Sequence, residues 1–125
     1  MPKFVVQRHH AERAGLHDDL RLELKPNKLY SWAVPKLVPT KANKKVLAIE
    51  TEIHDMSWYN FEGKIDEGYG KGIVKIVDRG KMTILKHTDK VIIVNLNGNK
   101  HKIDGTYVLV NIKNNQWLLW KRKTA

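Results

Sequence analysis

The sequence predicts an all-β protein of short, mostly antiparallel strands with only minor helical turns, folded as a β-barrel or a β-sandwich. Three observations lead to this prediction. Apolar and polar residues alternate with a period of two along much of the chain, and turn signals separate the alternating stretches. No segment of about a dozen residues keeps the 3.6-residue apolar period of an amphipathic helix. Many short strands joined by regular turns are typical of barrels and sandwiches.

The alternation is clearest over residues 17–24, where leucines at 20, 22 and 24 are separated by charged residues, as in a strand with one buried face. Leu47, Ile49 and Ile53 alternate with polar residues in a second stretch. The remaining expected strands are Phe4–Gln7, Leu29–Val34, Gly72–Val77, Met82–Lys86, Val91–Leu96, Thr106–Ile112 and Gln116–Lys121. The expected turns are rich in Gly, Pro, Asn and Asp, and they are Pro26-Asn27, Asp78-Arg79-Gly80, Asn97-Gly98-Asn99, Asp104-Gly105 and Asn114-Asn115. Residues 10–14 could form a helical turn.

Length and composition indicate one domain spanning residues 1–125. A hydrophobic content of 42% argues against disorder, and no apolar run is long enough to span a membrane. The absence of cysteine excludes a disulfide scaffold, a thiolate nucleophile and a Cys-ligated zinc or iron–sulfur site. Because the N-terminal residues lack the features of a signal peptide, we expect a cytoplasmic protein without a membrane partner.

The chain is strongly basic, with 23 Lys and Arg against 13 Asp and Glu and a formal net charge of +10. Such an excess favours polyanionic partners through phosphate neutralisation and counterion release. The lysines are spread over residues 25–45, 64–90 and 100–123, which suits a folded surface better than a disordered basic tail. A solvated lysine surface without a partner would have the same composition, so the charge alone leaves both alternatives open.

A candidate metal site lies on the polar face of the strand expected over residues 17–24. His17, Asp19 and Arg21 project from one side of this strand, and His9 or His10 could join them from the preceding segment. Two imidazoles and one carboxylate leave coordination positions open, as in a catalytic metal site, and Arg21 could bind a phosphate beside the ion. An ordinary solvated face with an ion pair between Asp19 and Arg21 explains the same spacing.

A second polar group, Glu50, Glu52 and His54, repeats at the same spacing of two and is expected to share one face of another strand. Acidic and basic residues spaced in this way also occur on exposed strands that carry no chemistry. The spacing therefore leaves a functional face and a solvated face as alternatives.

Seven short motifs follow one another along the first 80 residues: FVVQRHHA at 4–11, LHDDLRLEL at 16–24, SWAVPK at 31–36, EIH at 52–54, FEG at 61–63, EGYGKG at 67–72 and DRG at 78–80. Together they resemble the 3′-phosphoesterase domain of bacterial DNA ligase D and its stand-alone archaeal relatives. Motifs that match in order are far more specific than any one of them. The resemblance implies a compact β-barrel, in agreement with the strand pattern.

The resemblance also implies a divalent metal, typically Mn²⁺, with Zn²⁺ or Co²⁺ as alternatives. The positions that match the metal ligands of the family are His9, His17 and Asp19. The positions that match its catalytic groups are Arg21, which contacts phosphate, His54 and Glu52. Because Ala14-Gly15 lengthens the loop between the two ligand histidines, His10 remains an alternative to His9.

The implied activity is removal of a 3′-phosphate or a 3′-terminal ribonucleotide to leave a 3′-OH. The expected partners are DNA or RNA-terminated DNA 3′ ends, with a separate DNA ligase or polymerase acting next. Arg21 and a protonated His54 would offset charge on the phosphoryl oxygens, or His54 would protonate the leaving oxygen. Glu52 would hold the imidazole of His54 or position water.

The expected substrate-binding residues are Lys36, Trp58, Tyr59 and Lys71. A tyrosine that is usual in the family, four residues after the second-strand histidine, is Trp58 in this chain. A tyrosine hydroxyl at the phosphate would therefore have to come from Tyr59.

Two other functions remain as alternatives. The H-x-D spacing of His17 and Asp19, with a distal histidine, is also typical of a non-haem iron oxygenase. A non-catalytic basic barrel could instead bind single-stranded nucleic acid by stacking bases on exposed aromatic residues such as Trp58 and Tyr69. Metal-dependent release of phosphate from a 3′-phosphorylated oligonucleotide would distinguish the three functions.

Overall fold

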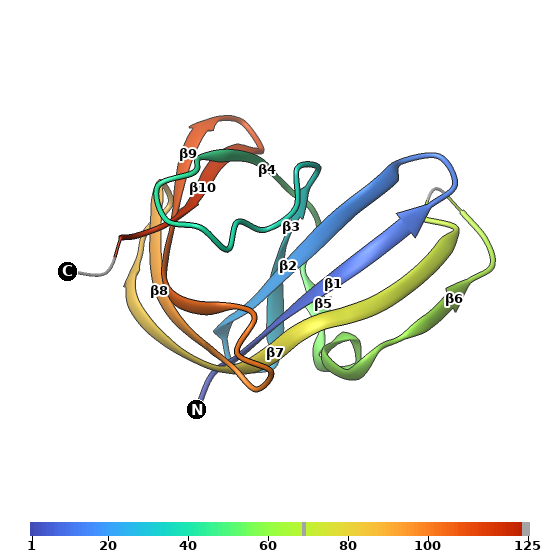
Figure 1. Cartoon of the computed structure of the whole chain (residues 1–125), viewed down its shortest axis with the longest axis horizontal. Coiled ribbons are helices and arrows are strands. Elements are labelled where there is room, and N and C mark those ends of the chain that lie inside the picture. The colour runs from blue at the N-terminus through green and yellow to red at the C-terminus, as the bar shows by residue number, and fades with distance from the viewer. Residues whose placement is uncertain (69, 124–125) are drawn as a thin grey trace.

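The computed structural model describes residues 1–68 and 70–123, and its central feature is a closed ring of eight antiparallel strands (Figure 1). The ring follows the order β1-β2-β3-β4-β10-β9-β8-β7, and β7 pairs with β1 to close it. The elements are β1 (Lys3–Ala11), β2 (Gly15–Lys25), β3 (Lys28–Val34), β4 (Val46–Glu50), β5 (His54–Asp55), the 3-10 helix η1 (Met56–Asn60), β6 (Gly63–Ile65), β7 (Gly72–His87), β8 (Val91–Gly98), β9 (Asp104–Lys113) and β10 (Gln116–Lys121). The predicted all-β barrel is confirmed.

The apolar side of each alternating strand faces the interior of this ring. Leu20, Leu22 and Leu24 of β2 are buried there, together with Trp32 of β3 and Leu119 of β10. Residues of β2 that lie between the leucines face the opposite side of the sheet, because successive side chains of a strand alternate. The barrel therefore buries one face of β1, β2 and β3 and leaves their outer face for other contacts.

Several predicted boundaries differ from the structure. The turn expected at Asp104-Gly105 lies instead over residues 99–103, and β9 begins at Asp104. The expected turn at Asp78-Arg79-Gly80 does not form, and β7 runs without interruption from Gly72 to His87. Asp78 is fully buried and accepts hydrogen bonds from four backbone N–H groups, so its carboxylate serves a neighbouring loop instead of a turn. In addition, β1 continues to Ala11, so residues 10–14 form no helical turn.

The polar residues Glu50, Glu52 and His54 do not share the face of one strand. β4 ends at Glu50, whose Oε1 accepts a hydrogen bond from the indole N–H of Trp117. The chain then leaves the sheet, and β5 begins at His54 and pairs with β3. Residues spaced by two share a face only along a continuous strand, and the chain is not a strand between Glu50 and His54. Of the three residues, His54 is the one that β5 places beside β3.

The strands that carry the site extend beyond the barrel. β1, β2 and β7 continue as a long arm, and β6 pairs with β7 along its edge (Figure 1). The segment from β5 through η1 to β6 lies against the outer face of this arm, as the contacts of η1 with Gln7 show. None of the helical segments within residues 1–68 and 70–123 combines the length and the apolar content needed to cross a bilayer.

Candidate metal centre and phosphate pocket

Strand register brings the predicted ligands together on the outer face of the arm. Along β2 the leucines face the barrel, so His17, Asp19 and Arg21 face outward. In the pairing of β1 with β2, His9 lies opposite His17 and Gln7 lies opposite Asp19. Because paired residues of neighbouring antiparallel strands share a face, all five side chains gather on one surface.

Three of these side chains form a compact donor cluster. One potential ligand atom each from His9, His17 and Asp19 lies within 4.8 Å of the other two. His9 Nδ1 is 3.5 Å from Asp19 Oδ2, and His17 Nε2 is 3.4 Å from Asp19 Oδ1. Two imidazole nitrogens and one carboxylate oxygen are donors that suit a divalent transition metal, and three protein ligands leave further positions for water or substrate.

Backbone carbonyls determine which nitrogen of each imidazole is free to bind an ion. His9 Nε2 lies 2.7 Å from the carbonyl oxygen of Gly70, and His17 Nδ1 lies 3.2 Å from that of Gly15. A carbonyl only accepts hydrogen bonds, so these nitrogens carry the protons. The lone pairs then remain on His9 Nδ1 and His17 Nε2, the two atoms that face Asp19. Metal-ligating histidines are held in this way, so the residues fit a metal ion.

The charges of the cluster are also those of a metal site. Burial alone would raise the pKa of Asp19, but its hydrogen bond with His17 and the positive charge of Arg21 outweigh burial and lower that pKa. The lone pairs described above belong to the neutral rings. In the metal-free protein a protonated His17 donates a hydrogen bond from Nε2 to Asp19, which raises the pKa of His17, and a bound cation would take the place of that proton. Asp19 is therefore a carboxylate at neutral pH, which is the form that binds a cation.

Arg21 is buried beside the cluster with its guanidinium held by neighbouring strands. Its Nε donates to Gln7 Oε1 at 2.7 Å, and its Nη1 donates to Ser31 Oγ at 2.9 Å. Its Nη2 lies 3.7 Å from Asp19 Oδ2. Burial lowers the pKa of Arg21, but a guanidinium remains charged in proteins. The side chain therefore presents Nη2 as a cationic donor next to the candidate metal ligands.

Gln7 is a site residue that the sequence analysis missed. Its side chain is fully buried, and its Nε2 donates to the carbonyl oxygens of Trp58 at 2.7 Å and Phe61 at 3.0 Å. Gln7 thus attaches η1 to β1 while its Oε1 holds Arg21. A signal was present in the sequence, because Gln7 precedes His9 by two residues and must share its face if both lie on one strand.

His54 and Trp58 form the far wall of the site. His54 Nδ1 lies 2.9 Å from the carbonyl oxygen of Glu52 and 3.2 Å from Arg21 Nη1. The Trp58 ring contacts His54 edge-on at 5.0 Å between centroids, and the guanidinium of Arg21 lies 5.0 Å from the centroid of the same ring. Glu52 therefore orients the imidazole through its backbone carbonyl, not through its carboxylate.

The expectation of a protonated His54 is not met. Burial lowers the pKa of His54, and the positive charge of Arg21 lowers it further. The imidazole is therefore neutral at neutral pH. His54 Nδ1 has three contacts, to the Glu52 carbonyl, Arg21 Nη1 and Ser31 Oγ. The shortest, to the Glu52 carbonyl, assigns the proton to Nδ1 and leaves Nε2 as the acceptor of the ring.

Comparison with known proteins identifies the family. The family described as "DNA Ligase D 3'-phosphoesterase domain" matches residues 7–111, a range that contains the whole site. The chain belongs to this family. It is 43% identical over 126 residues to the multifunctional non-homologous end joining protein LigD of Mycobacterium bovis and 40% identical over 133 residues to LigD of Mycolicibacterium smegmatis. These matches cover 96% and 97% of the chain but 16% and 17% of the relatives, so the chain spans about a sixth of their length.

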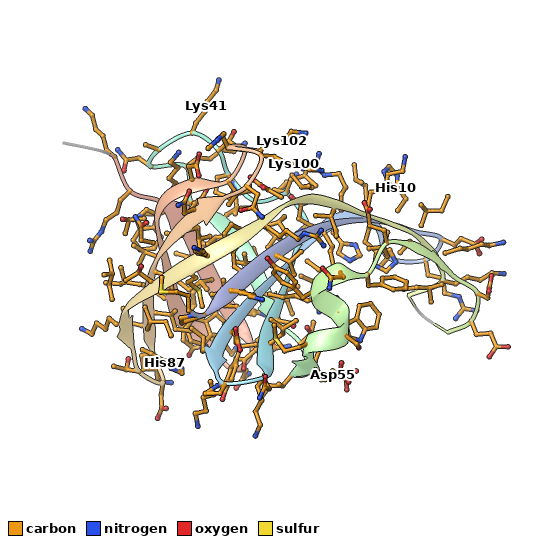
Figure 2. The ribbon with its side chains drawn as sticks, turned by 90° about the horizontal axis from the view of Figure 1, so that it is seen from below. His10, Lys41, Asp55, His87, Lys100 and Lys102 are labelled. Carbon is orange, nitrogen blue, oxygen red and sulfur yellow. The ribbon has the colours of Figure 1, made fainter. Side chains whose placement is uncertain are left out.

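A pocket of about 380 Å³ in this 3′-phosphoesterase family member is lined by most of the predicted site residues. They are His9, His17, Asp19, Arg21, Glu52, His54 and Trp58. His10, labelled in Figure 2, is exposed, and because it is adjacent to His9 in β1 its side chain lies on the other face of that strand. The structure thus places His9, and not His10, among the candidate ligands.

Three predicted substrate-binding residues lie outside this pocket. Tyr59 packs between Lys3 and Arg79, whose charged groups are 5.3 Å and 5.4 Å from its ring centroid, so it does not supply the hydroxyl that Trp58 lacks. Lys71 pairs with Glu12 at the tip of the arm, and Lys36 lines a separate groove. Tyr69 lies outside the described residues.

Proposed function

We propose that this chain is a divalent-metal-dependent phosphoesterase that removes a 3′-phosphate or a 3′-terminal ribonucleotide from DNA or primer ends and leaves a 3′-OH. One observation is central to the proposal: the Nη2 donor of the buried Arg21 lies beside the donor cluster formed by one imidazole nitrogen each of His9 and His17 and the carboxylate of Asp19. A bound cation and a guanidinium are the groups that stabilise a phosphoryl transition state. Membership of the 3′-phosphoesterase family supports the 3′ end as the position of cleavage.

His9 Nδ1, His17 Nε2 and Asp19 would hold the metal, for which Mn²⁺ is our first choice and Zn²⁺ and Co²⁺ are alternatives. A bound divalent ion would act as a Lewis acid toward a nonbridging phosphate oxygen. The carbonyls of Gly70 and Gly15 keep the two imidazoles in the tautomers that this binding needs.

Arg21 would bind the phosphate and offset the negative charge that grows on its oxygens. Gln7 and Ser31 occupy two of its N–H groups and fix the plane of the guanidinium, which leaves Nη2 for a phosphate oxygen. A donor that is fixed before the substrate arrives costs no reorganisation during the reaction, so its contribution is larger than that of a mobile side chain.

His54 would accept a proton from the attacking water. The water forms a bond to phosphorus, the bond between phosphorus and the departing 3′ oxygen breaks, and one proton of the water moves to His54 Nε2. The departing oxygen takes a proton from solvent water to become the 3′-OH, and His54 then returns its proton to solvent. A neutral imidazole is the form that can accept this proton, and burial and Arg21 keep His54 neutral. Trp58 would cover this side of the pocket with an apolar surface against which the terminal nucleotide can stack.

The same donor set would also suit the ferrous ion of a non-haem oxygenase. A phosphate-binding guanidinium held among the ligands, and the family match, favour phosphoester hydrolysis. The proposed partners are DNA or RNA-terminated DNA 3′ ends, and a separate DNA ligase or polymerase would use the 3′-OH.

The test uses two oligonucleotides of one sequence, one with a 3′-phosphate and one with a 5′-phosphate. We expect release of phosphate from the 3′-phosphorylated strand in the presence of Mn²⁺, and none after chelation. The His17→Ala variant should be inactive, and the matched His10→Ala variant, which alters an exposed histidine one strand away, should remain active. Equal release from the 5′-phosphate, or hydrolysis that survives chelation and His17→Ala, would contradict the proposal.

A further inference from the structure

Two loops meet at one end of the barrel. β3 and β8 are four places apart in a ring of antiparallel strands, so they run in the same direction and end at the same rim. The segment 35–45 follows β3, and the segment 99–103 follows β8. Both send an apolar side chain into the barrel, Val38 from the first and Ile103 from the second, and both side chains join the core. The two loops therefore close the same end of the barrel.

These loops carry six exposed lysines. Lys45 lies over the ring of Trp120, and we call the other five the lysine rim: Lys36, Lys41, Lys44, Lys100 and Lys102. Lys41, Lys100 and Lys102 lie along one edge of the molecule, and Asp55 at the start of η1 lies at the opposite edge (Figure 2). Within residues 1–68 and 70–123, none of the five forms an ion pair with a carboxylate. Their charges are therefore not neutralised within the described part of the chain.

Two buried carboxylates hold the backbone of these loops, and a partly exposed third, Asp104, faces His101. Asp18 binds Arg8 Nε at 2.9 Å and accepts from the backbone N–H of Val38 at 2.8 Å. Asp78 accepts from the backbone N–H groups of Lys100 and Lys102, each at 2.9 Å. Each loop is thus fixed by a fully buried aspartate, while its lysine side chains point to solvent. This arrangement orders the backbone of both loops and leaves the lysine ammonium groups free to contact a ligand in solvent.

A groove of about 440 Å³ runs beside the first loop. Arg8, Lys36, Lys41 and Lys44 line it with Thr40 and three apolar residues, and no Asp or Glu is among the lining residues. The Arg8 side chain stays 37% exposed although it binds Asp18. A concave surface with four cationic groups and one hydroxyl fits a chain of phosphates.

We propose that the lysine rim, together with Arg8, binds the phosphodiester backbone of duplex DNA as a second nucleic-acid contact outside the metal pocket. This inference rests on the proposed function, because a 3′-end phosphoesterase must hold the duplex behind the end that it processes. Lysine ammonium groups act as point charges toward phosphates, so the contact is independent of sequence. Arg8 and His9 are neighbours on opposite faces of β1, so one strand connects the groove to the candidate metal centre.

The test compares two triple variants of equal charge. Lys41→Glu/Lys44→Glu/Lys102→Glu alters the rim, and Lys25→Glu/Lys86→Glu/Lys113→Glu alters exposed lysines near the opposite end of the barrel. Each changes the formal net charge from +10 to +4, since three charges of +1 become −1. Binding to a fluorescent 24-base-pair duplex and to a 6-base-pair duplex is measured by anisotropy in chelator across a range of salt, so that hydrolysis plays no part.

We expect the rim variant to bind the long duplex at least about tenfold more weakly than the control variant. The slope of log K against log [salt] should also become less steep by about 2–3, because each lost phosphate contact removes about 0.9 from its magnitude. The difference should shrink on the short duplex. Equal losses in both variants, or a loss that does not depend on duplex length, would overturn the inference. If the rim variant has a lowered melting temperature, Lys41→Gln/Lys102→Gln against Lys25→Gln/Lys113→Gln provides the same comparison. Failure of the proposed phosphoesterase activity would leave this binding result unchanged, so the two failures are distinguishable.

Discussion

Gln7 and Arg21 bind each other from neighbouring strands, with the Arg21 Nε–H donating to Gln7 Oε1 at 2.7 Å and both side chains buried. The amide nitrogen of the same glutamine donates to the carbonyls of Trp58 and Phe61. One side chain therefore positions the guanidinium that faces the candidate metal ligands and also attaches the segment that covers them.

Replacing this amide should misplace Arg21. In Gln7→Leu, the Nε of Arg21 and two backbone carbonyls lose their partner, so we expect kcat/KM for a 3′-phosphate to fall by about 10–100-fold, the usual effect of removing a group that orients a site residue. Gln7→Glu keeps an acceptor for Arg21 but turns its second oxygen toward two carbonyls and places a negative charge beside the guanidinium, so we expect it to lower kcat/KM as well. Steady-state kinetics of both variants, with circular dichroism to check folding, would measure this. Wild-type kinetics in Gln7→Leu would contradict the positioning role.

Metal affinity should distinguish His9 from its neighbour. His9 lies in the donor cluster and His10 is exposed on the other face of β1, so His9→Ala should weaken Mn²⁺ binding by at least about tenfold and His10→Ala should have little effect. Isothermal titration calorimetry on the metal-free variants gives both affinities. A greater loss with His10→Ala would show that the ligand set is wrong.

The charge of Arg21 should be detectable at His54. Burial and Arg21 lower the pKa of His54, so removing the guanidinium in Arg21→Gln should raise that pKa toward its ordinary value. Arg79→Gln is the matched control, because Arg79 packs on Tyr59 outside the pocket. The imidazole resonances of His54, followed against pH in the metal-free protein, would show the change. An unmoved or lowered pKa in Arg21→Gln would exclude the electrostatic coupling.

Asp78 should contribute to stability in a defined pH range. Burial alone would raise its pKa, but four backbone N–H bonds, among them those of Lys100 and Ile103, outweigh burial and lower it. The folded pKa is below the unfolded value of 3.8, so this stabilisation is present above about pH 3.8 and is lost as the pH falls through the folded pKa. In Asp78→Asn the amide N–H₂ group faces backbone donors, which should cost about 2–4 kcal/mol at pH 7.

Urea unfolding of the wild type and Asp78→Asn at pH 7 and pH 3 would test this. The stability difference between the two proteins should be smaller at pH 3 than at pH 7. Asp104→Asn serves as a control, because Asp104 is partly exposed and accepts one backbone N–H. A difference that stays constant with pH would show that the hydrogen bonds of Asp78 do not depend on its charge.

The alternation along residues 17–24 by itself determined which side chains of β2 share a face. A strand has a side-chain period of two, so burying Leu20 and Leu22 sends His17, Asp19 and Arg21 to the other side wherever the strand is placed. The all-β class followed from the same periodicity, and the barrel in place of a sandwich followed from the resemblance to a family. The motif at 31–36 and the histidine at 54 could be assigned to the site only through their resemblance to a family.

Contacts between segments distant in the sequence were decided by the tertiary structure alone. The sequence does not specify which carbonyl accepts the hydrogen bond from His9 Nε2, and in the fold it is the carbonyl of Gly70, 61 residues away. Likewise, Asp78-Arg79-Gly80 has the composition of a turn, but burial of the Asp78 carboxylate against a distant loop keeps β7 continuous. Local patterns determine the direction of a side chain within its strand. Strand register and loop placement depend on contacts throughout the barrel, so they cannot be read from one short segment.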